Sequence, residues 1–308
     1  MGTTLRIAVG AQSRPEGIHA IEEAFAAVRG LDALLSTWRD DSELARVNRA
    51  PLGRPVLLSP VLYRLLRDVA GWVVLTHGAF DPTIGPLIDA WDLRGHGRVP
   101  TGAALARARR AVGMNHFVFS DSSAITRTDS ASWLDSGGFG KGVALGAARL
   151  ALLRRRVTSA HLNFGGQILV IGRDRSGKDW AVPVAHPSHR LEPAAWLRLR
   201  DRSASTSSQS ERFVTVQGRR IGHILDPRTG QPVPAWGSVT VVAEDPAVAD
   251  AVSTALLVLG PEAGARWAES RPDLGVLFLL DDNGRVKPRW NHALEQYLVM
   301  DSNSSRGG

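Results

Sequence analysis

Cysteine is absent from all 308 residues of this chain. Its absence excludes disulfide bonds, thiolate nucleophiles and cysteine–zinc sites. Any bound metal must therefore be held by oxygen or imidazole ligands, and oxygen ligands favour hard cations such as Mg²⁺. The sequence also lacks an uninterrupted apolar run approaching the roughly 18 residues that a membrane-spanning helix needs.

A secretory leader is not visible at the start of the sequence. Residues 1–10 are typical of a β-strand and not of a charged segment followed by an apolar core. For the chain as it stands, we expect a cytoplasmic location.

Composition and charge indicate a globular protein that attracts anions weakly. Hydrophobic residues make up 44% and charged residues 22%, as in ordinary soluble domains, and the length suffices for a large core. The formal net charge is +7, but the arginines are spread along the chain. We therefore expect binding of small anionic ligands and no nucleic-acid partner.

The predicted elements mix helices and strands without regular β-α-β alternation, which favours an α+β fold over a doubly wound sheet. Helical spacing of apolar residues predicts helices at 15–37, 59–76, 100–112, after Gly140, 247–259 and 261–269. Strands are predicted at 4–10, 117–120, 124–128, 158–163, 167–172, 181–184, 197–199, 212–217, 238–243 and 274–280. The serine-rich residues 203–210 are expected to form a disordered linker or a hydroxyl-lined loop. We expect one domain over 1–298 and a disordered tail at 299–308.

The predicted helix at 247–259 carries the most informative pattern. Asp250, Ser253 and Thr254 are its only polar residues, and offsets of three and four place them on one face. A helix this apolar should be buried, and a carboxylate buried with it needs compensation. Two interpretations remain open: an Asp paired with an arginine or a backbone amide, or a Mg²⁺ site built from oxygen donors.

A glycine-rich segment, residues 134–142, follows a strand and opens a helix. Glycines allow close approach of a ligand, and a helix N-terminus with Lys141 favours phosphate. The spacing is not that of a P-loop, and a tight strand-to-helix turn is the alternative.

Two further segments contain candidate ligand-binding residues. In residues 79–86, Asp81 and Thr83 could bond a ligand, although Asp-Pro is also ordinary turn chemistry. In residues 222–233, a turn is predicted around Asp226-Pro227 and Gly230. His223 there is either a base near neutral pH or a structural hydrogen-bonding residue.

In this order, the segments resemble the ApbE family of FAD:protein FMN transferases. The segments that carry the resemblance are 1–3, 36–38 with 41–44, 80–86, 135–142, 163–166, 223–233 and 249–260. The resemblance covers about residues 1–298. It implies a mixed α/β, T-fold-like architecture with FAD in a cleft between two lobes.

The resemblance also implies the roles of individual residues. The implied FAD contacts are Met1, Trp38, Ala79, Phe80, Asp81, Asp135, Lys141 and Ile224. The implied Mg²⁺ ligands are the Gly138 carbonyl, Asp250 and Thr254, with Ser253 adjacent. His223 or a nearby Asp would accept the proton of the attacking hydroxyl, and Asp250 would serve the catalytic metal.

The implied reaction is Mg²⁺-dependent transfer of FMN from FAD to a Thr or Ser hydroxyl of an acceptor flavoprotein, with release of AMP. The acceptor of such an enzyme can be a subunit of a membrane redox complex, and family members are often periplasmic or anchored to the inner membrane. Two alternatives remain open: hydrolysis of FAD to FMN and AMP, and a flavin-binding protein without activity.

Overall fold

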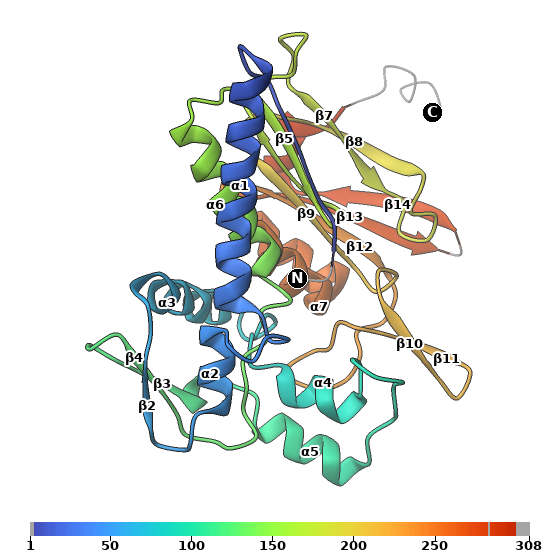
Figure 1. Ribbon diagram of the computed structural model, residues 1–308. Helices are drawn as coiled ribbons and strands as arrows, with labels where there is room; N and C mark the ends of the chain where they lie inside the picture. The colour runs from blue at the N-terminus through green and yellow to red at the C-terminus, as the bar shows by residue number, and fades with distance from the viewer. Residues whose placement is uncertain (1–2, 283, 300–308) are drawn as a thin grey trace.

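The computed structural model describes residues 3–282 and 284–299, which form two lobes (Figure 1). The sheet lobe contains a long antiparallel sheet with helices along it. The helical lobe lies below it in Figure 1 and contains short helices and a small sheet. One hydrophobic core runs through both lobes, because Leu62 and Leu66 of the helical lobe pack in the same cluster as Val239 and Leu256 of the sheet lobe.

Seven strands form the main sheet, and each neighbouring pair is antiparallel. The order is β1-β5-β6-β9-β12-β13-β14. Their bounds are β1 Leu5–Val9, β5 Ala160–Phe164, β6 Gln167–Ile171, β9 Ser203–Ser208, β12 Gly237–Ala243, β13 Gly275–Asp282 and β14 Arg285–Trp290.

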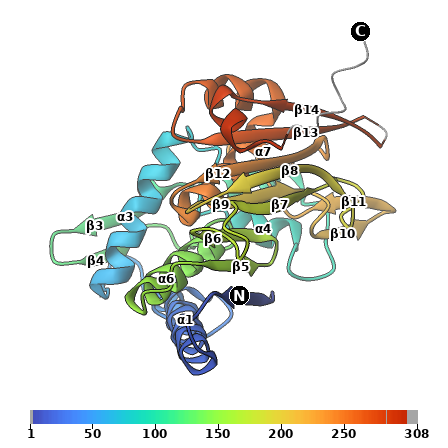
Figure 2. The same ribbon diagram turned by 90° about the horizontal axis from the view of Figure 1, so that it is seen from above.

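Three helices cover one face of this sheet: α1 (Arg14–Leu35), α6 (Gly140–Arg154) and α7 (Pro246–Glu269). The helix α6 packs between α1 and the sheet, and α7 lies against β9 and β12 (Figure 2). The start of α1 follows capping chemistry, since Ser13 accepts a hydrogen bond from the Glu16 amide.

The opposite face is covered by the hairpin of β7 (Trp180–Ala185) and β8 (Pro193–Leu199), together with the 3₁₀ helix η2 (His292–Tyr297). Successive side chains of β6 point to opposite faces of the sheet, as they do in any β-strand. Ile168 and Val170 pack under the hairpin, whereas Leu169 and Ile171 pack under α6.

The helical lobe contains shorter elements. Its helices are α2 (Glu43–Arg49), α3 (Pro60–Leu75), α4 (Gly85–Trp91), α5 (Gly102–Arg110) and the 3₁₀ helix η1 (Met114–His116). Its sheet has the order β2-β4-β3, with β2 Pro55–Leu57, β3 Phe117–Ser120 and β4 Ala124–Arg127. A separate hairpin, β10 (Phe213–Val216) with β11 (Arg219–Gly222), extends beside α4 (Figure 1).

The α+β prediction is confirmed, whereas the prediction for residues 203–210 is wrong. Residues Ser203–Ser208 form β9, which pairs with β6 and β12 inside the main sheet. The hydroxyl groups that suggested a loop are hydrogen-bonded within the sheet. Thr206 bonds Thr240 at 2.8 Å, and Ser203 donates to the Ile168 carbonyl at 2.8 Å. Of the predicted tail, only residue 299 lies within the described residues.

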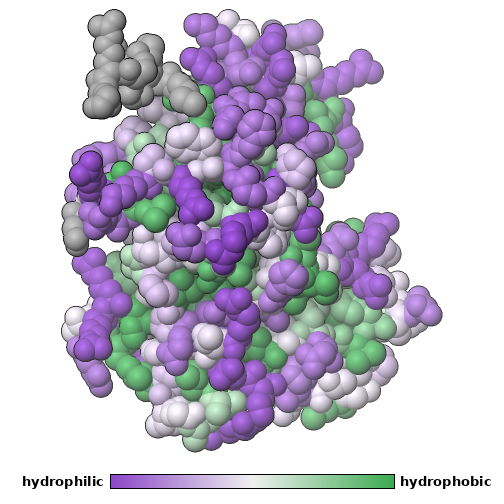
Figure 3. Space-filling model, turned by 180° about the vertical axis from the view of Figure 1, so that it is seen from behind, coloured by the Kyte–Doolittle hydropathy of each residue, from purple (hydrophilic) through white to green (hydrophobic). Residues whose placement is uncertain are grey.

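The two helices predicted on either side of Gly260 lie end to end as α7. Gly260 has a φ of 78°, outside the helical range, and it divides α7 at the predicted position. Among the described helices, α7 alone is long and apolar enough to cross a membrane, but 61% of its most apolar window is buried inside the protein, as in the core helix of a globular domain. Figure 3 shows the face opposite to Figure 1, where apolar residues are interspersed with polar ones, mostly in the lower half.

Candidate active site

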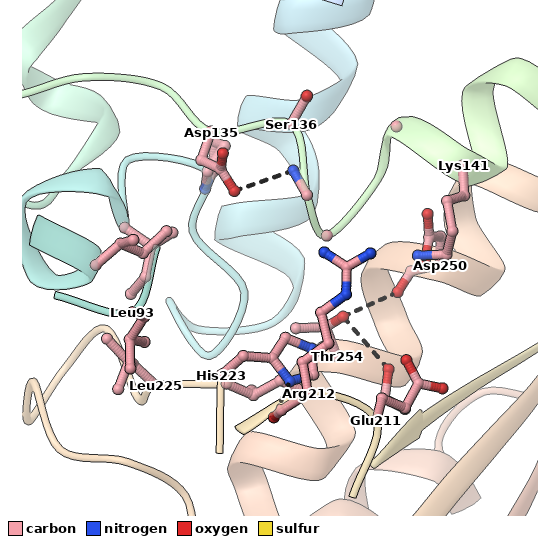
Figure 4. Close-up of a pocket in the computed structure, with 18 of the residues that line it drawn as sticks. Leu93, Asp135, Ser136, Lys141, Glu211, Arg212, His223, Leu225, Asp250 and Thr254 are labelled. Carbon is pink, nitrogen blue, oxygen red and sulfur yellow. Dashed lines mark hydrogen bonds and ion pairs between the residues drawn. The ribbon is translucent and has the colours of Figure 1, made fainter. Parts of the chain in front are cut away.

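A cavity of about 470 Å³ opens between the two lobes, a volume within the usual range of small-molecule sites. Its walls come from the segment after α3, the glycine-rich turn before α6, the end of β9, the segment after β11 and the first turns of α7 (Figure 4). The predicted site residues that line it are Trp38, Ala79, Phe80, Asp81, Asp135, Gly138, Lys141, His223, Ile224, Asp250 and Thr254. Met1 lies outside the described residues.

Asp250 lies on the cavity wall one turn into α7. The helix α7 begins at Pro246 because the preceding residue, Asp245, caps it: the Asp245 side chain accepts a hydrogen bond from the Ala247 amide at 2.8 Å. Proline suits this first turn of a helix. Asp250 is 2% exposed. Its Oδ1 accepts a hydrogen bond from Lys141 Nζ at 3.1 Å, and its Oδ2 accepts one from the Gly142 amide at 3.0 Å. The buried carboxylate is therefore compensated by an amide and by a lysine, not by an arginine.

Close contact between α6 and α7 makes this pairing possible. A Cβ added to Gly142 would lie 2.2 Å from the Pro246 carbonyl oxygen and 2.6 Å from the Ala247 Cα. A side chain at this position would push the two helix N-termini apart. Glycine is required here because the backbone amide of α6 must reach the carboxylate on α7.

Lys141 and Asp250 form a partly buried ion pair, and Figure 4 shows their side chains meeting from α6 and α7. Burial alone would lower the pKa of Lys141, but the charge of Asp250 and its hydrogen bond outweigh burial and raise that pKa above its ordinary value. The lysine therefore carries its positive charge at neutral pH, close to the N-terminus of α6. This arrangement favours a bound phosphate.

Hydroxyl groups continue the wall beside Asp250. Thr254 lies one turn further along α7, and its Oγ1 donates to the Asp250 carbonyl at 3.2 Å and lies 3.4 Å from Ser207 Oγ of β9. Ser253 is fully buried behind the wall, where it contacts Ser207 at 2.9 Å and Ser205 at 3.3 Å. Ser253 therefore supports Thr254 and does not line the cavity.

The oxygen donors of this wall supply part of the ligand set that a hard cation needs. Asp250 offers a carboxylate, Thr254 a hydroxyl and Gly138 a carbonyl, and Gly138 lies opposite Thr254, whose Oγ1 is 3.7 Å from the position of a Gly138 Cβ. Among the described residues, no three His, Cys, Asp or Glu side chains come together in a metal-binding group. A Mg²⁺ ion here would depend on substrate phosphates and water for the rest of its ligands, as is usual for Mg²⁺ at phosphate sites.

Phe80 and Asp81 form the wall opposite α7. Phe80 is 3% exposed and packs edge-on against Trp72 and Phe139, with ring centroids 6.4 Å apart in both pairs. Asp81 accepts hydrogen bonds from the Thr83 amide at 2.8 Å and the Thr83 hydroxyl at 2.6 Å. Burial raises the pKa of Asp81, and the two Thr83 bonds oppose that increase. The turn interpretation of this segment and the ligand interpretation are therefore compatible.

The glycine-rich turn is joined to this wall at Asp135. Its amide donates to the Pro82 carbonyl at 2.6 Å, and its carboxylate accepts a hydrogen bond from the Gly137 amide at 3.1 Å (Figure 4). The same carboxylate forms an ion pair with Arg94. Trp38 lines the cavity nearby and is 70% exposed.

His223 lies beside Thr254 and Arg212 (Figure 4). Its Nδ1 is 3.1 Å from the Arg212 carbonyl, which can only accept, so Nδ1 carries the proton and Nε2 is left with a free electron pair. Burial, with a smaller contribution from the positive charges of Arg212, Lys141 and Arg190, lowers the pKa of His223 to about 4, and the hydrogen bond to the Arg212 carbonyl opposes this decrease. The imidazole is therefore neutral at pH 7 and able to accept a proton.

Gln209 fixes the segment that carries His223 and Ile224. Its Nε2 donates to the carbonyls of Ile224 at 2.6 Å and Val233 at 2.8 Å, and its Oε1 accepts a hydrogen bond from the Ile224 amide at 3.0 Å. The predicted turn within this segment is confirmed, since the Gly230 amide donates to the Asp226 carbonyl at 2.7 Å.

Four charged residues of the cavity were not predicted: Arg94, Arg190, Glu211 and Arg212. Burial raises the pKa of Glu211, while Arg190 and Lys141 act to lower it. Arg190 forms an ion pair with Glu211 at 3.4 Å. In sequence these residues resemble ordinary surface charges. In the sequence, the position of Glu211 and Arg212 directly after the hydroxyl-rich segment 203–210 could have indicated that they belong to the site.

Comparisons with known proteins identify the family of this chain. The chain matches the ApbE family over residues 1–278. It is 28% identical to an FAD:protein FMN transferase of Klebsiella pneumoniae, covering 98% of this chain and 89% of that protein. It is 30% identical to an FAD:protein FMN transferase of Treponema pallidum, covering 92% and 83%.

Solved structures give the same result. The ApbE protein of Thermotoga maritima superposes with a TM-score of 0.87 at 28% identity, covering 97% of both chains. The apo flavinyl transferase ApbE of Pseudomonas stutzeri superposes with a TM-score of 0.81 at 27% identity, covering 94% of this chain and 96% of that one. Sequence and fold agree over nearly the full length, and we conclude that this chain belongs to the ApbE family.

Proposed function

We propose that this protein transfers FMN from FAD to a Thr or Ser hydroxyl of an acceptor protein, in a Mg²⁺-dependent reaction that releases AMP. One observation carries the proposal: Asp250, Lys141 and Thr254 share one wall of a cavity in a chain whose curated relatives are FAD:protein FMN transferases. Carboxylate, ammonium and hydroxyl groups together suit a dinucleotide's pyrophosphate and its cation.

Asp250, Thr254 and the Gly138 carbonyl would hold Mg²⁺. When bound, the ion would neutralise charge on the pyrophosphate during transfer. Lys141 and the Gly142 amide orient the Asp250 carboxylate, because together they contact both of its oxygens from the side of α6.

The transfer itself needs a nucleophile, a base and a leaving group. The acceptor hydroxyl oxygen forms a bond to the phosphorus of the FMN half, and the bond from that phosphorus to the bridging oxygen breaks, so that AMP leaves with the bonding electrons. The hydroxyl proton passes to His223 Nε2, the unprotonated nitrogen of a ring that is neutral at pH 7. The positive charges of Lys141 and the α6 N-terminus favour the developing negative charge.

Incubation with FAD, Mg²⁺ and an acceptor domain bearing one target Thr tests this function. The expected result is a mass increase of the acceptor by one FMN less one water, absent when that Thr is replaced by Val. Asp250→Asn should abolish transfer at limiting Mg²⁺. The matched control is Asp68→Asn, an exposed aspartate on α3, which should transfer at the wild-type rate.

Three outcomes would contradict the proposal in different ways. Release of free FMN and AMP without modification of the acceptor would indicate a pyrophosphatase. Tight FAD binding without turnover would indicate a flavin-binding protein. Full activity of Asp250→Asn at limiting Mg²⁺ would refute the assignment of the metal site.

A further inference from the structure

Arg94 occupies the cavity mouth between two indole rings. It follows α4, lines the cavity, and its side chain is 28% exposed. The guanidinium carbon lies 4.7 Å from the centroid of the Trp38 ring and 4.8 Å from that of the Trp133 ring. Both distances are within the range of cation–π attraction, so the guanidinium joins the two rings.

Polar contacts fix the orientation of this guanidinium. Its Nη2 donates to Thr37 Oγ1 at 3.0 Å and forms an ion pair with the Asp135 carboxylate. Asp135 is itself held by the Gly137 amide at 3.1 Å. Because the charge of Arg94 is balanced by Asp135, the residue is better suited to support a neighbour than to bind a phosphate directly.

Trp133 provides a rigid base for the arrangement. Its Nε1 donates to Asp89 Oδ2 at 2.9 Å. Its ring lies so close to Gly85 that a Cβ there would be 2.2 Å from the indole carbons. Trp133 is therefore fixed by α4 on one side, and it supports Arg94 on the other.

Trp38, in contrast, is 70% exposed and lines the cavity. An indole with so much exposed surface has few contacts that define its position, and the guanidinium of Arg94 is one of them. With one face on Arg94, the ring can present the other face to a planar group of a ligand.

We propose that Arg94 is a positioning residue, which holds Trp38 as a stacking platform for a planar ring of FAD at the cavity mouth. This inference rests on the proposed use of FAD. Arginine suits the role because its flat guanidinium stacks on an indole while its edge bonds Thr37 and Asp135. Lysine keeps the charge but lacks the planar fork.

The test uses Arg94→Ala, Arg94→Lys, Trp38→Ala and the double variant Arg94→Ala/Trp38→Ala. Equilibrium FAD binding with Mg²⁺ is followed by quenching of flavin fluorescence, and steady-state transfer gives KM and kcat separately. Both Arg94 variants should weaken FAD binding and raise KM by about three- to tenfold with little change in kcat. The double variant should bind FAD no more weakly than Trp38→Ala alone, because the effect of Arg94 passes through Trp38.

Thermal melts confirm that each variant is folded, and Arg107→Lys, an exposed arginine on α5, is the matched control with wild-type binding. Wild-type FAD binding by Arg94→Lys would show that charge alone suffices and would overturn the proposal. Additive losses in the double variant would also overturn it, since Arg94 would then act independently of Trp38. If the wild-type protein bound FAD without transferring FMN, the proposed function would fail while the binding experiment still decided the role of Arg94.

Discussion

Replacing Gly142 by Ala tests whether the close approach of α6 and α7 builds the site. The new Cβ would lie 2.2 Å from the Pro246 carbonyl oxygen and 2.6 Å from the Ala247 Cα, both of them backbone atoms at the start of α7. Backbone cannot rotate away as a side chain can. The helix ends must therefore separate by roughly 1 Å before the contact becomes an ordinary one.

The loss of stability expected for Gly142→Ala has two parts, and both follow from the separation of the two helix ends. Overpacking of this kind costs about 1–3 kcal/mol. The same displacement would lengthen the 3.0 Å hydrogen bond from the Gly142 amide to Asp250 beyond bonding range, and a bond to a charged group is worth about 1.5–3 kcal/mol. We expect the free energy of unfolding to fall by about 3–5 kcal/mol, and FMN transfer to be lost because Asp250 is no longer held.

Thermal unfolding followed by circular dichroism measures this effect, and Gly146→Ala is its matched control. Gly146 lies one turn further along α6, and a Cβ there would be 3.6 Å from Pro246 Cγ, which is ordinary contact. Gly146→Ala should be neutral or stabilise the protein by about 0.5–1 kcal/mol, the usual gain from replacing glycine inside a helix. If the two variants unfolded at the same temperature, the close approach would not be a constraint and the reasoning would be refuted.

Three further predictions concern the same site. Lys141→Met should lower the free energy of unfolding by about 2–3 kcal/mol, because Asp250 stays buried without its cation, and Lys141→Met/Asp250→Asn should recover part of that loss in urea titrations. Gln209→Leu should cost about 2–4 kcal/mol and expose the segment 223–233 to proteolysis, because it removes three hydrogen bonds; wild-type protease resistance would contradict this. The pKa of His223 is about 4 in the folded protein against 6.5 ordinarily, so the unfolded chain binds the extra proton first as pH falls. Wild-type stability relative to His223→Asn should therefore decrease between pH 6.5 and about 4 and be constant above that window; a difference that did not change with pH would rule out the burial of this imidazole.

The pattern of α7 could be predicted from sequence because its signals are local. Asp245 caps the helix, Gly260 interrupts it, and the spacing of Asp250 and Thr254 places both on one face. Each of these features depends on residues within a few turns of one another. The spacing alone did not decide whether this face lines a cavity or meets buried partners, since one polar stripe on an apolar helix must meet either water or partners.

The strand β9 could not be predicted because its stability depends on distant partners. A run of serines is typical of loops, where hydroxyls bond water or the local backbone. Here Ser207 bonds Ser253 of α7 at 2.9 Å, and Thr206 bonds Thr240 of β12 at 2.8 Å, both far away in sequence. The same limit explains why Arg94 was missed, since its cation–π contacts with Trp38 and Trp133 exist only after three separate segments have met.

Packing and chemistry at this site have one origin, which is the smallness of the residues where α6 meets α7. Gly142 and Ala247 allow the two helix N-termini to touch, and this contact brings a backbone amide and the Lys141 ammonium to the same carboxylate. Larger residues would leave Asp250 buried without these donors, and a buried carboxylate without partners costs free energy. The orientation of the proposed metal ligand therefore depends on the distance between two helix backbones, and small residues at the contact keep that distance short.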